Sequence, residues 1–363
     1  MCSGFWKTCI STGKWPPTIR WPSIRKHCCG VKDYRLPAPL PIDFADITAA
    51  AKRLDGVALV TPLLESDAIN AATGARVLIK AECLQRTGAF KIRGAYNKIS
   101  QLTPEQRAKG VVAFSSGNHA QGVARAARIL GAPAQIVMPA DAPAIKTRNT
   151  KADGAIVIAY DRREANRVAI ANEITMRTGA TLVPPYDDLD VMAGQGTVGL
   201  EIAAQAEALN VRLDAVLGPC SGGGMIGGTA VALRQMSPET EVYAVEPVGF
   251  DDTARSLAAG ERIEIDPPAP SICDALLIET PGKVTFPVTG ALLAGGLTVS
   301  DDWVRSAMGL AFDALKVVFE PSGAIALAAL MQDQDRFAGK TVVIIATGGN
   351  VDRKMFGEVI SAD

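Results

Sequence analysis

Short runs of apolar, largely β-branched residues recur from about residue 41 and predict buried strands of parallel sheet. The eight clearest are Ala75–Lys80, Val111–Phe114, Ala134–Met138, Ala155–Ala159, Ala180–Val183, Ala215–Gly218, Glu241–Val245 and Thr341–Ala346. Helical periodicity lies between most of them, most clearly in His119–Leu130 and Asp161–Arg177, which glycines follow. Asp161 and Asp301 stand where helix N-caps belong. This alternation predicts an α/β protein that binds ligands at the carboxyl ends of its strands.

Size and composition fit a globular protein of about two domains. The 363 residues are 48% hydrophobic, and 37 basic against 38 acidic residues leave a net charge of −1, which argues against nucleic-acid binding. No apolar run approaches the ~18 residues of a membrane span. The chain has only two histidines, which argues against a histidine-rich zinc site and against a Ser-His-Asp hydrolase. Cys83, Cys220 and Cys273, thinly spread, suggest reduced thiols and a cytoplasmic protein.

Residues 1–40 differ from the rest of the chain. They hold three of the four tryptophans and four of the seven cysteines, and seven basic residues face one acidic residue, Asp33. They lack the continuous apolar core of a signal peptide, and their prolines argue against a transit-peptide helix. The adjacent Cys28 and Cys29 give weak support to a zinc site. We therefore expect a disordered extension or a start-site artefact.

The first loop that suggests chemistry leads to Lys91. It follows a predicted strand, places Thr87 and Gly88 in a turn, and sets Lys91 at the start of a helix. The helix dipole disfavours a cation there. A neutral lysine, or one joined as an imine to a carbonyl compound, removes this conflict. An ordinary solvated lysine is the alternative.

The second loop, Ser115–His119, lies directly between a strand and a helix. Its small residues expose backbone N–H groups at a helix N-terminus, where a carboxylate or phosphate binds readily. Ser116 offers a hydroxyl and Asn118 an amide to orient the ligand. The alternative is a plain helix cap by one of the two serines, and His119 alone would be a packed core histidine.

The third loop is rich in glycine, and the fourth follows the last predicted strand. Ser221–Met225 holds three consecutive glycines, which let a backbone wrap a phosphate. Gly222, Gly224 and Gly227 also fit G-x-G-x-x-G, with Glu246 about twenty residues further on, so this loop alone leaves a nicotinamide site open. In the fourth loop, the Thr347 hydroxyl is available to a ring nitrogen of a flat heterocycle.

Together the four loops resemble the pyridoxal-phosphate enzymes of the tryptophan-synthase-β fold type, above all the serine/threonine dehydratase and serine racemase group. The resemblance runs from about residue 41 to the end of the chain. It implies a two-domain, open twisted parallel-sheet sandwich. The large cofactor-binding domain would comprise residues 41–112 and 190–363, and residues 113–189 would form a small inserted domain, with pyridoxal 5'-phosphate between the two.

The resemblance also implies a role for each loop. Lys91 matches the catalytic Schiff-base lysine, Phe90 the residue beside the cofactor ring, and Asn118 the partner of the pyridoxal hydroxyl. Thr347 matches the partner of the pyridine nitrogen, where relatives often have serine, and Glu320 a glutamate near the cofactor. The phosphate cup would consist of Ser221, Gly222, Gly223, Gly224 and Met225. The substrate carboxylate would bind at Ser115, Ser116, Gly117, Asn118 and His119, with Ser116 also matching the second acid/base of racemisation.

A divalent-cation site is implied near the end of another predicted strand. Glu246, the carbonyl of Phe250 and Asp252 resemble a family site of two carboxylates and one backbone oxygen, ligands that suit Mg²⁺ or Ca²⁺. Phe250 replaces a small residue, which is harmless where only its carbonyl binds. The alternative is that Asp251 or Asp252 caps the following helix.

The resemblance implies a lyase that converts L-threonine or L-serine into a 2-oxo acid and ammonia. A serine racemase or a 3-hydroxyaspartate dehydratase is the alternative within the fold, because Ser116 and the cation site suit both. Outside it remain a nicotinamide-dependent oxidoreductase and a non-catalytic amino-acid-binding module. The chain ends soon after the Thr347 loop, so we expect no regulatory domain and no isoleucine feedback. A homodimer acting on a small amino acid, away from membranes, completes the expectation.

Overall fold

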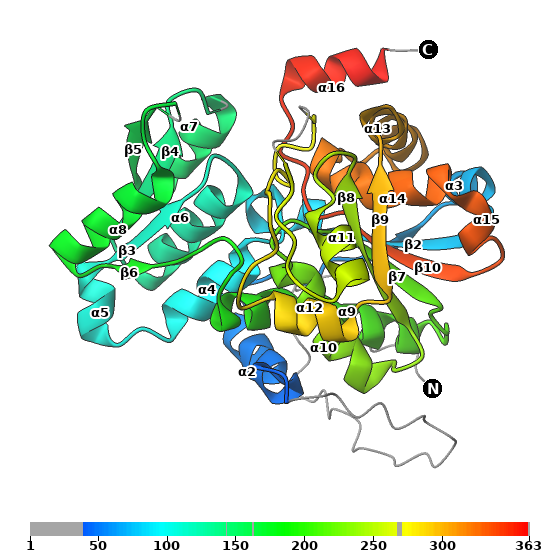
Figure 1. The fold of residues 1–363 in the computed structure, drawn as a ribbon, viewed down its shortest axis with the longest axis horizontal. Coiled ribbons are helices and arrows are strands. Elements are labelled where there is room, and N and C mark those ends of the chain that lie inside the picture. The colour runs from blue at the N-terminus through cyan, green and yellow to red at the C-terminus, as the bar shows by residue number, and fades with distance from the viewer. Residues whose placement is uncertain (1–38, 143, 162, 267–270, 362–363) are drawn as a thin grey trace.

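The computed structural model describes residues 39–142, 144–161, 163–266 and 271–361. The extension predicted at residues 1–40 therefore lies outside the described residues, apart from its last two. The described chain forms two sheets, each sandwiched between helices and lying side by side along the long axis of the molecule (Figure 1). This confirms the predicted α/β fold with parallel sheets.

The larger sheet has six strands in the order β1-β2-β10-β7-β8-β9, all parallel to their neighbours except β1 to β2. Its strands are β1 (Leu63–Glu65), β2 (Arg76–Lys80), β7 (Ala215–Pro219), β8 (Glu241–Pro247), β9 (Gly295–Val299) and β10 (Thr341–Ile345). Val77 and Ile79 face one core with α13 (Asp301–Leu315) and α14 (Pro321–Gln332). Leu78 faces the other core with α9 (Leu189–Ala208) and α10 (Gly224–Met236). Because both faces are covered, the central residues of β2, β7 and β10 are apolar.

The smaller sheet has four parallel strands in the order β5-β4-β3-β6. They are β3 (Val111–Phe114), β4 (Ala134–Pro139), β5 (Ile156–Tyr160) and β6 (Thr181–Leu182). Helices α4 (Ile92–Ser100) and α6 (Asn118–Leu130) share a core with one face, and α8 (Arg167–Thr178) covers the other. All its strands come from residues 111–182, within the range predicted for the inserted domain, and the division into domains stays a prediction.

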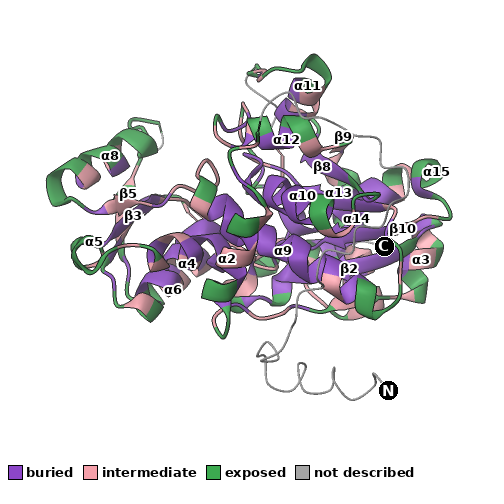
Figure 2. Ribbon diagram, turned by 90° about the horizontal axis from the view of Figure 1, so that it is seen from below, coloured by how far each residue is buried: buried purple, intermediate pink, exposed green. Residues whose placement is uncertain are grey.

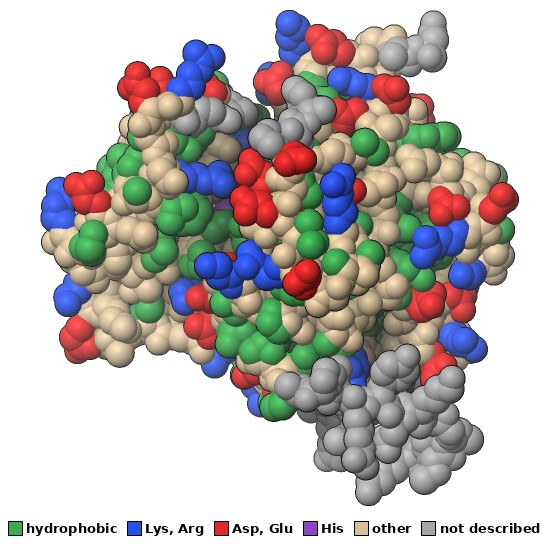
Figure 3. Space-filling view, in the orientation of Figure 1, with side chains coloured by type: hydrophobic (Ala, Val, Ile, Leu, Met, Phe, Trp, Pro, Cys, Tyr) green, Lys and Arg blue, Asp and Glu red, His purple; other side chains and the backbone are tan. Residues whose placement is uncertain are grey.

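The remaining elements are short. They are α2 (Phe44–Leu54), α3 (Asp67–Thr73), η1 (Glu82–Leu84), η2 (Arg86–Gly88), α5 (Pro104–Lys109), α7 (Ala144–Ala152), α11 (Asp252–Ala259), α12 (Phe286–Leu292), α15 (Gln334–Phe337) and α16 (Arg353–Ile360). The most buried helices, α9, α10 and α14, lie in the interior of the molecule (Figure 2). Among the described residues, no helix combines the length and apolarity needed to cross a bilayer. Basic and acidic side chains are interspersed on the face in Figure 3.

The eight predicted strands are all present, within two residues at each end. The prediction missed β1, which has only three residues, and β9, which begins with two glycines that disfavour a strand. The helix predicted from Asp161 was wrong at its start: α8 begins at Arg167, because the Asn166 side chain accepts hydrogen bonds from the first-turn amides. The cap predicted at Asp301 was also wrong. Ser300 is the N-cap, and the Asp301 carboxylate instead accepts hydrogen bonds from the Ser271 hydroxyl and the Ile272 amide.

Candidate active site

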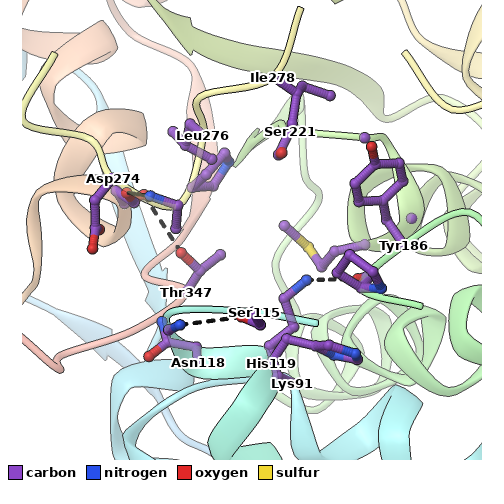
Figure 4. A pocket seen from close by; sticks show the side chains of 18 of the residues that line it. Lys91, Ser115, Asn118, His119, Tyr186, Ser221, Asp274, Leu276, Ile278 and Thr347 are labelled. Carbon is purple, nitrogen blue, oxygen red and sulfur yellow. Dashed lines mark hydrogen bonds between the residues drawn. The ribbon is translucent and has the colours of Figure 1, made fainter. Parts of the chain in front are cut away.

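The loops singled out in the sequence meet at one cavity between the two sheets (Figure 4). They leave the carboxyl ends of β3, β7 and β10, or precede α4, so side chains far apart in the sequence reach the same space. Every predicted cofactor and substrate residue lines it: Phe90, Lys91, Ser115, Ser116, Gly117, Asn118, His119, Ser221, Gly222, Gly223, Gly224, Met225, Glu320 and Thr347. The structure does not bring Glu246, Phe250 and Asp252 to this cavity wall.

Lys91 is held with its amine turned into the cavity. It is the N-cap residue of α4, its Nζ donates to the carbonyl oxygen of Pro185 at 2.7 Å, and it lies 5.0 Å from the centre of the Phe90 ring. Burial lowers the pKa of the Lys91 amine to about 8. A larger fraction of this amine is therefore neutral near pH 7 than of a solvated lysine, which suits the attachment to a carbonyl compound predicted for it.

A strained turn leads the chain into Lys91. Thr87 and Gly88 have φ values of 66° and 71°, in the left-handed region that threonine rarely adopts. The Asn350 amide donates to the Thr87 carbonyl and to Asn118 Oδ1, at 2.8 Å each. Asn350 thus joins this turn to the loop after β3, a role that no sequence motif indicated. The predicted turn is present, and its conformation depends on a contact from the end of the chain.

Asn118 and Glu320 form a polar pair at the base of the cavity. The Asn118 amide donates to Glu320 Oε1, while the second oxygen of Glu320 is buried without a partner among the described residues. Burial raises the pKa of Glu320 to about 7. An Asn amide has two hydrogens, so one remains for a ligand. The unpartnered oxygen and the remaining amide hydrogen fit a polar heterocycle such as the pyridoxal ring.

The Ser115–His119 loop has the open amides of a helix N-terminus. Gly117 is the N-cap of α6, and no described side chain caps the helix, so the plain serine cap was wrong. The Ser115 hydroxyl instead accepts from the Gly117 amide at 3.1 Å. His119 is 2% exposed, and its Nε2 donates to the Val183 carbonyl oxygen at 2.8 Å. Burial lowers the pKa of His119 to about 3, so this histidine is packed and neutral, and the loop is free to receive an anion.

The glycine loop forms a cradle at the N-terminus of α10. Gly223 is the N-cap, has a φ of 85°, and no described side chain caps the helix. The Thr285 hydroxyl donates to the Gly222 carbonyl, and a β-carbon on Gly222 would collide with the Tyr186 ring. The helix therefore leaves its first amides open at the cavity, and any side chain on the glycines would fill the space. This arrangement fits a phosphate group.

Thr347 closes the opposite side of the cavity. It is 4% exposed, its hydroxyl lies 3.5 Å from the Ser322 carbonyl oxygen, and its own carbonyl oxygen accepts from the Phe90 amide at 3.2 Å. The second contact fixes Phe90 and Thr347 relative to each other. Together with the phosphate cradle and Lys91, the described residues fit pyridoxal phosphate at three points.

Several cavity residues escaped the sequence prediction. Among them are Lys146, Arg167, Pro185, Tyr186 and Asp274. Lys146 Nζ donates a hydrogen bond to Asp274 Oδ2 at 2.6 Å, forming an ion pair. The Arg167 guanidinium lies 5.7 Å from the centre of the Phe114 ring. None of them belongs to a glycine-rich or serine-rich loop, so only the tertiary fold reveals them.

The predicted cation site lies where β8 leads into α11. Both oxygens of Asp252 are buried without a hydrogen-bond partner among the described residues. The carboxylate of Glu246 accepts hydrogen bonds from the first-turn amides of Thr253 at 3.0 Å and Ala254 at 2.8 Å, so Glu246 caps α11, whereas the side chain of the N-cap residue Asp251 makes no capping hydrogen bond. Burial raises the pKa of Glu246 to about 8 and that of Asp252 to about 7. The alternative of a capping aspartate was wrong, and the unpartnered oxygens fit a hard cation.

A cation at this site should stabilise the folded protein. We expect saturating Mg²⁺ or Ca²⁺ to raise the melting temperature, since a ligand at about 100 times its dissociation constant contributes about 2.7 kcal/mol. Differential scanning calorimetry before and after chelation measures this. Asp252→Asn should remove the response, while Asp251→Asn should retain it. An identical melting temperature with and without either cation would make Glu246 and Asp252 structural residues only.

Comparisons with known proteins agree with this geometry. A family model described as pyridoxal-phosphate dependent enzyme matches residues 55–348. The L-threo-3-hydroxyaspartate ammonia-lyase of Pseudomonas sp is 45% identical over 317 residues, covering 87% of this chain and 98% of that protein. The serine racemase of Schizosaccharomyces pombe is 40% identical, covering 88% of this chain and 97% of that protein. The structure of maize serine racemase superposes with a TM-score of 0.82 at 39% identity, covering 87% of this chain and 96% of that one.

Proposed function

This chain belongs to the family of pyridoxal-phosphate-dependent enzymes, and from that premise we propose that it is an ammonia-lyase for 3-hydroxyaspartate-like substrates. The nicotinamide interpretation of the glycine loop and the non-catalytic binding module are both wrong, since the chain is an enzyme of the pyridoxal-phosphate ammonia-lyase and racemase group. L-Threonine and L-serine, the substrates that the sequence favoured, are here the second choice. The homodimer and the cytoplasmic location stay predictions.

The observation that favours 3-hydroxyaspartate as the substrate is the position of Arg167. It is the first residue of α8, it lines the cavity, and it has no carboxylate partner among the described residues. A guanidinium binds a carboxylate through two parallel hydrogen bonds. The second carboxylate of 3-hydroxyaspartate would use this group, whereas the methyl group of threonine and the hydrogen of serine would not.

The other cavity residues have complementary tasks in the proposed reaction. When bound, pyridoxal phosphate supplies an electron sink for the charge that develops at the α-carbon. The open amides at the start of α6 bind the α-carboxylate and fix the substrate. Lys91 Nζ, whose pKa of about 8 lies near neutral pH, takes the proton from the α-carbon. Tyr186 and Leu276 line the cavity, where their apolar surface would limit the access of water. The β-hydroxyl group takes up a proton and leaves as water, and the released enamine tautomerises and reacts with one water molecule to give a 2-oxo acid and ammonia.

Replacing Arg167 tests the substrate. We expect Arg167→Met to lower kcat/KM for L-threo-3-hydroxyaspartate by roughly tenfold to a hundredfold, the effect of one charged hydrogen-bonded contact. The value for L-serine should change less than about threefold. Steady-state kinetics on both substrates measures this.

The matched control is Arg177→Met, an exposed arginine at the far end of the same helix, which should change neither value. Equal losses on both substrates would leave Arg167 a structural residue. If the wild-type enzyme prefers L-threonine or L-serine to 3-hydroxyaspartate, the proposed substrate is wrong and the protein is a threonine or serine dehydratase.

Racemisation is the second candidate activity, because Ser116 lines the cavity at the predicted place of a second acid/base residue. Ser116→Ala should suppress any conversion of L-serine into D-serine at least about tenfold more than dehydration of the L-substrate. Chiral chromatography alongside an oxo-acid assay measures both rates. Should both fall equally, Ser116 only positions the substrate carboxylate.

A further inference from the structure

An ion pair joins the two halves of the cavity wall. Lys146, on α7 beside the smaller sheet, contacts Asp274 in the loop after α11, with 2.6 Å between Nζ and Oδ2. The two members differ in exposure, because Lys146 is 4% exposed whereas 48% of the Asp274 side chain is accessible. Both line the cavity, and Figure 4 places Asp274 at its edge, on the side of Thr347.

The Lys146 ammonium also lies beside the predicted carboxylate loop. A β-carbon placed on Gly117 would stand 3.7 Å from Nζ. Burial alone would lower the pKa of Lys146, but attraction by Glu320 and Asp274 raises it above its usual value. The buried Lys146 ammonium is therefore attracted by two carboxylates, those of Glu320 and Asp274. It lies where a bound substrate would bring further negative charge.

The balance of charge in the cavity wall depends on this lysine. Once the Lys91 amine holds the cofactor, the remaining lining cations are Lys146 and Arg167, and the lining carboxylates are Asp274 and Glu320. A dicarboxylic amino acid arrives with a net negative charge. Like charges brought together in a desolvated pocket exclude a ligand strongly, which is how binding sites reject the wrong partner.

We propose that the Lys146–Asp274 pair determines specificity: Lys146 offsets negative charge of the carboxylates in the cavity wall and so admits a substrate with a second carboxylate. This inference rests on the proposed function and extends it, since Arg167 attracts the second carboxylate and Lys146 removes the repulsion against it. Lys146 is a specificity-determining residue in this account and takes no part in proton transfer.

The test measures binding, apart from turnover. L-Aspartate and L-asparagine have the same shape, differ in one charge, and lack the β-hydroxyl that elimination needs. Calorimetric titration of each into the holoenzyme gives the ratio of their dissociation constants. We expect Lys146→Met to shift that ratio at least about tenfold against aspartate, and Asp274→Asn to shift it in favour of aspartate. The double variant should return close to the wild-type ratio, because it removes one charge of each sign.

Lys98→Met is the matched control. Lys98 pairs with Asp188 at the same 2.6 Å but lies outside the cavity lining, so the ratio should not move. Equal weakening of both ligands in Lys146→Met would overturn the inference and leave the pair a structural link between the two sheets. If Lys146→Met does not fold, the half-exposed Asp274→Asn still decides, because an unchanged ratio there contradicts the proposal.

The experiment separates this inference from the proposed function. If the ratios shift as expected but the wild-type enzyme turns over L-serine or L-threonine faster than 3-hydroxyaspartate, the proposed substrate is wrong and the role of the pair stands. If 3-hydroxyaspartate is the best substrate and the ratios do not move, the pair fails as a determinant while the proposed function stands.

Discussion

Lys91→Ala is expected to abolish covalent attachment of the cofactor and to lower β-elimination by at least about a thousandfold. Loss of a positioned general base alone accounts for about 10²–10⁴-fold. The other lysine in the cavity lining, Lys146, is held by Asp274 at 2.6 Å and is therefore a poor substitute. After borohydride reduction and digestion, mass spectrometry should find the pyridoxyl group on the wild-type peptide that contains Lys91 and on no peptide of the variant.

Lys98→Ala provides the control for this experiment, because it removes a lysine from the same helix without touching the cavity lining. It should keep the label on Lys91 and retain turnover. A pyridoxyl mass on another peptide of the wild-type protein, or turnover that survives in Lys91→Ala, would falsify the role assigned to this amine.

Part of the site was predictable because of how parallel sheets are built. The carboxyl ends of parallel strands lie at one edge of a sheet, so the loops after β7 and β10, which are neighbours in the larger sheet, point toward the same region, whereas β3 belongs to the smaller sheet. The resemblance to the pyridoxal-phosphate family predicted that Ser116 would share a site with Gly223 and Thr347, whereas the sequence does not reveal that β10 lies between β2 and β7. A run of small residues after a strand is a strong local indication of a binding loop. In the structure, these loops all line the same cavity.

The cavity residues that the sequence did not reveal belong to no recognisable sequence motif. Arg167 and Lys146 lie in ordinary polar stretches of helices, and Asp274 lies in a loop without a motif. Their importance arises from tertiary contacts that bring charge to the cavity. The Pro185 carbonyl that holds the Lys91 amine is a backbone group, which no side-chain pattern can identify.

Behind the cavity, the packing buries four charges that the sequence also left unremarked. Arg93 donates to both oxygens of Glu82, at 2.8 and 2.7 Å, and to both of Glu201, at 2.6 and 2.9 Å. Lys80 completes the group through Glu201 at 2.6 Å, and each of the four side chains is at most 2% exposed. The group joins β2, η1, α4 and α9, and it fixes the helix that begins beside Lys91.

Arg93→Met should destabilise the protein by about 3–5 kcal/mol, the usual cost of leaving a buried charge without its partner. After the change, two buried carboxylates face one remaining cation, Lys80. Urea unfolding followed by circular dichroism measures the free energy of unfolding. The control is Arg76→Met, which breaks an equally short pair with Glu65 at 2.8 Å whose side chains are 46% and 34% accessible. Because water screens it, that loss should be below about 1 kcal/mol.

The pH dependence separates lost charge pairing from lost packing. In the wild-type protein, burial alone would raise the pKa of Glu82, but the attraction and hydrogen bonds of Arg93, together with smaller effects of Lys80 and Thr61, lower it below its usual value. Without Arg93, burial raises that pKa above its unfolded value, so the folded variant binds a proton more tightly than the unfolded chain does. The deficit of Arg93→Met should therefore be largest above neutral pH and shrink as the pH falls toward about 5. A deficit that stays constant over this range would mean that Arg93 contributes through its packing volume rather than through its charge.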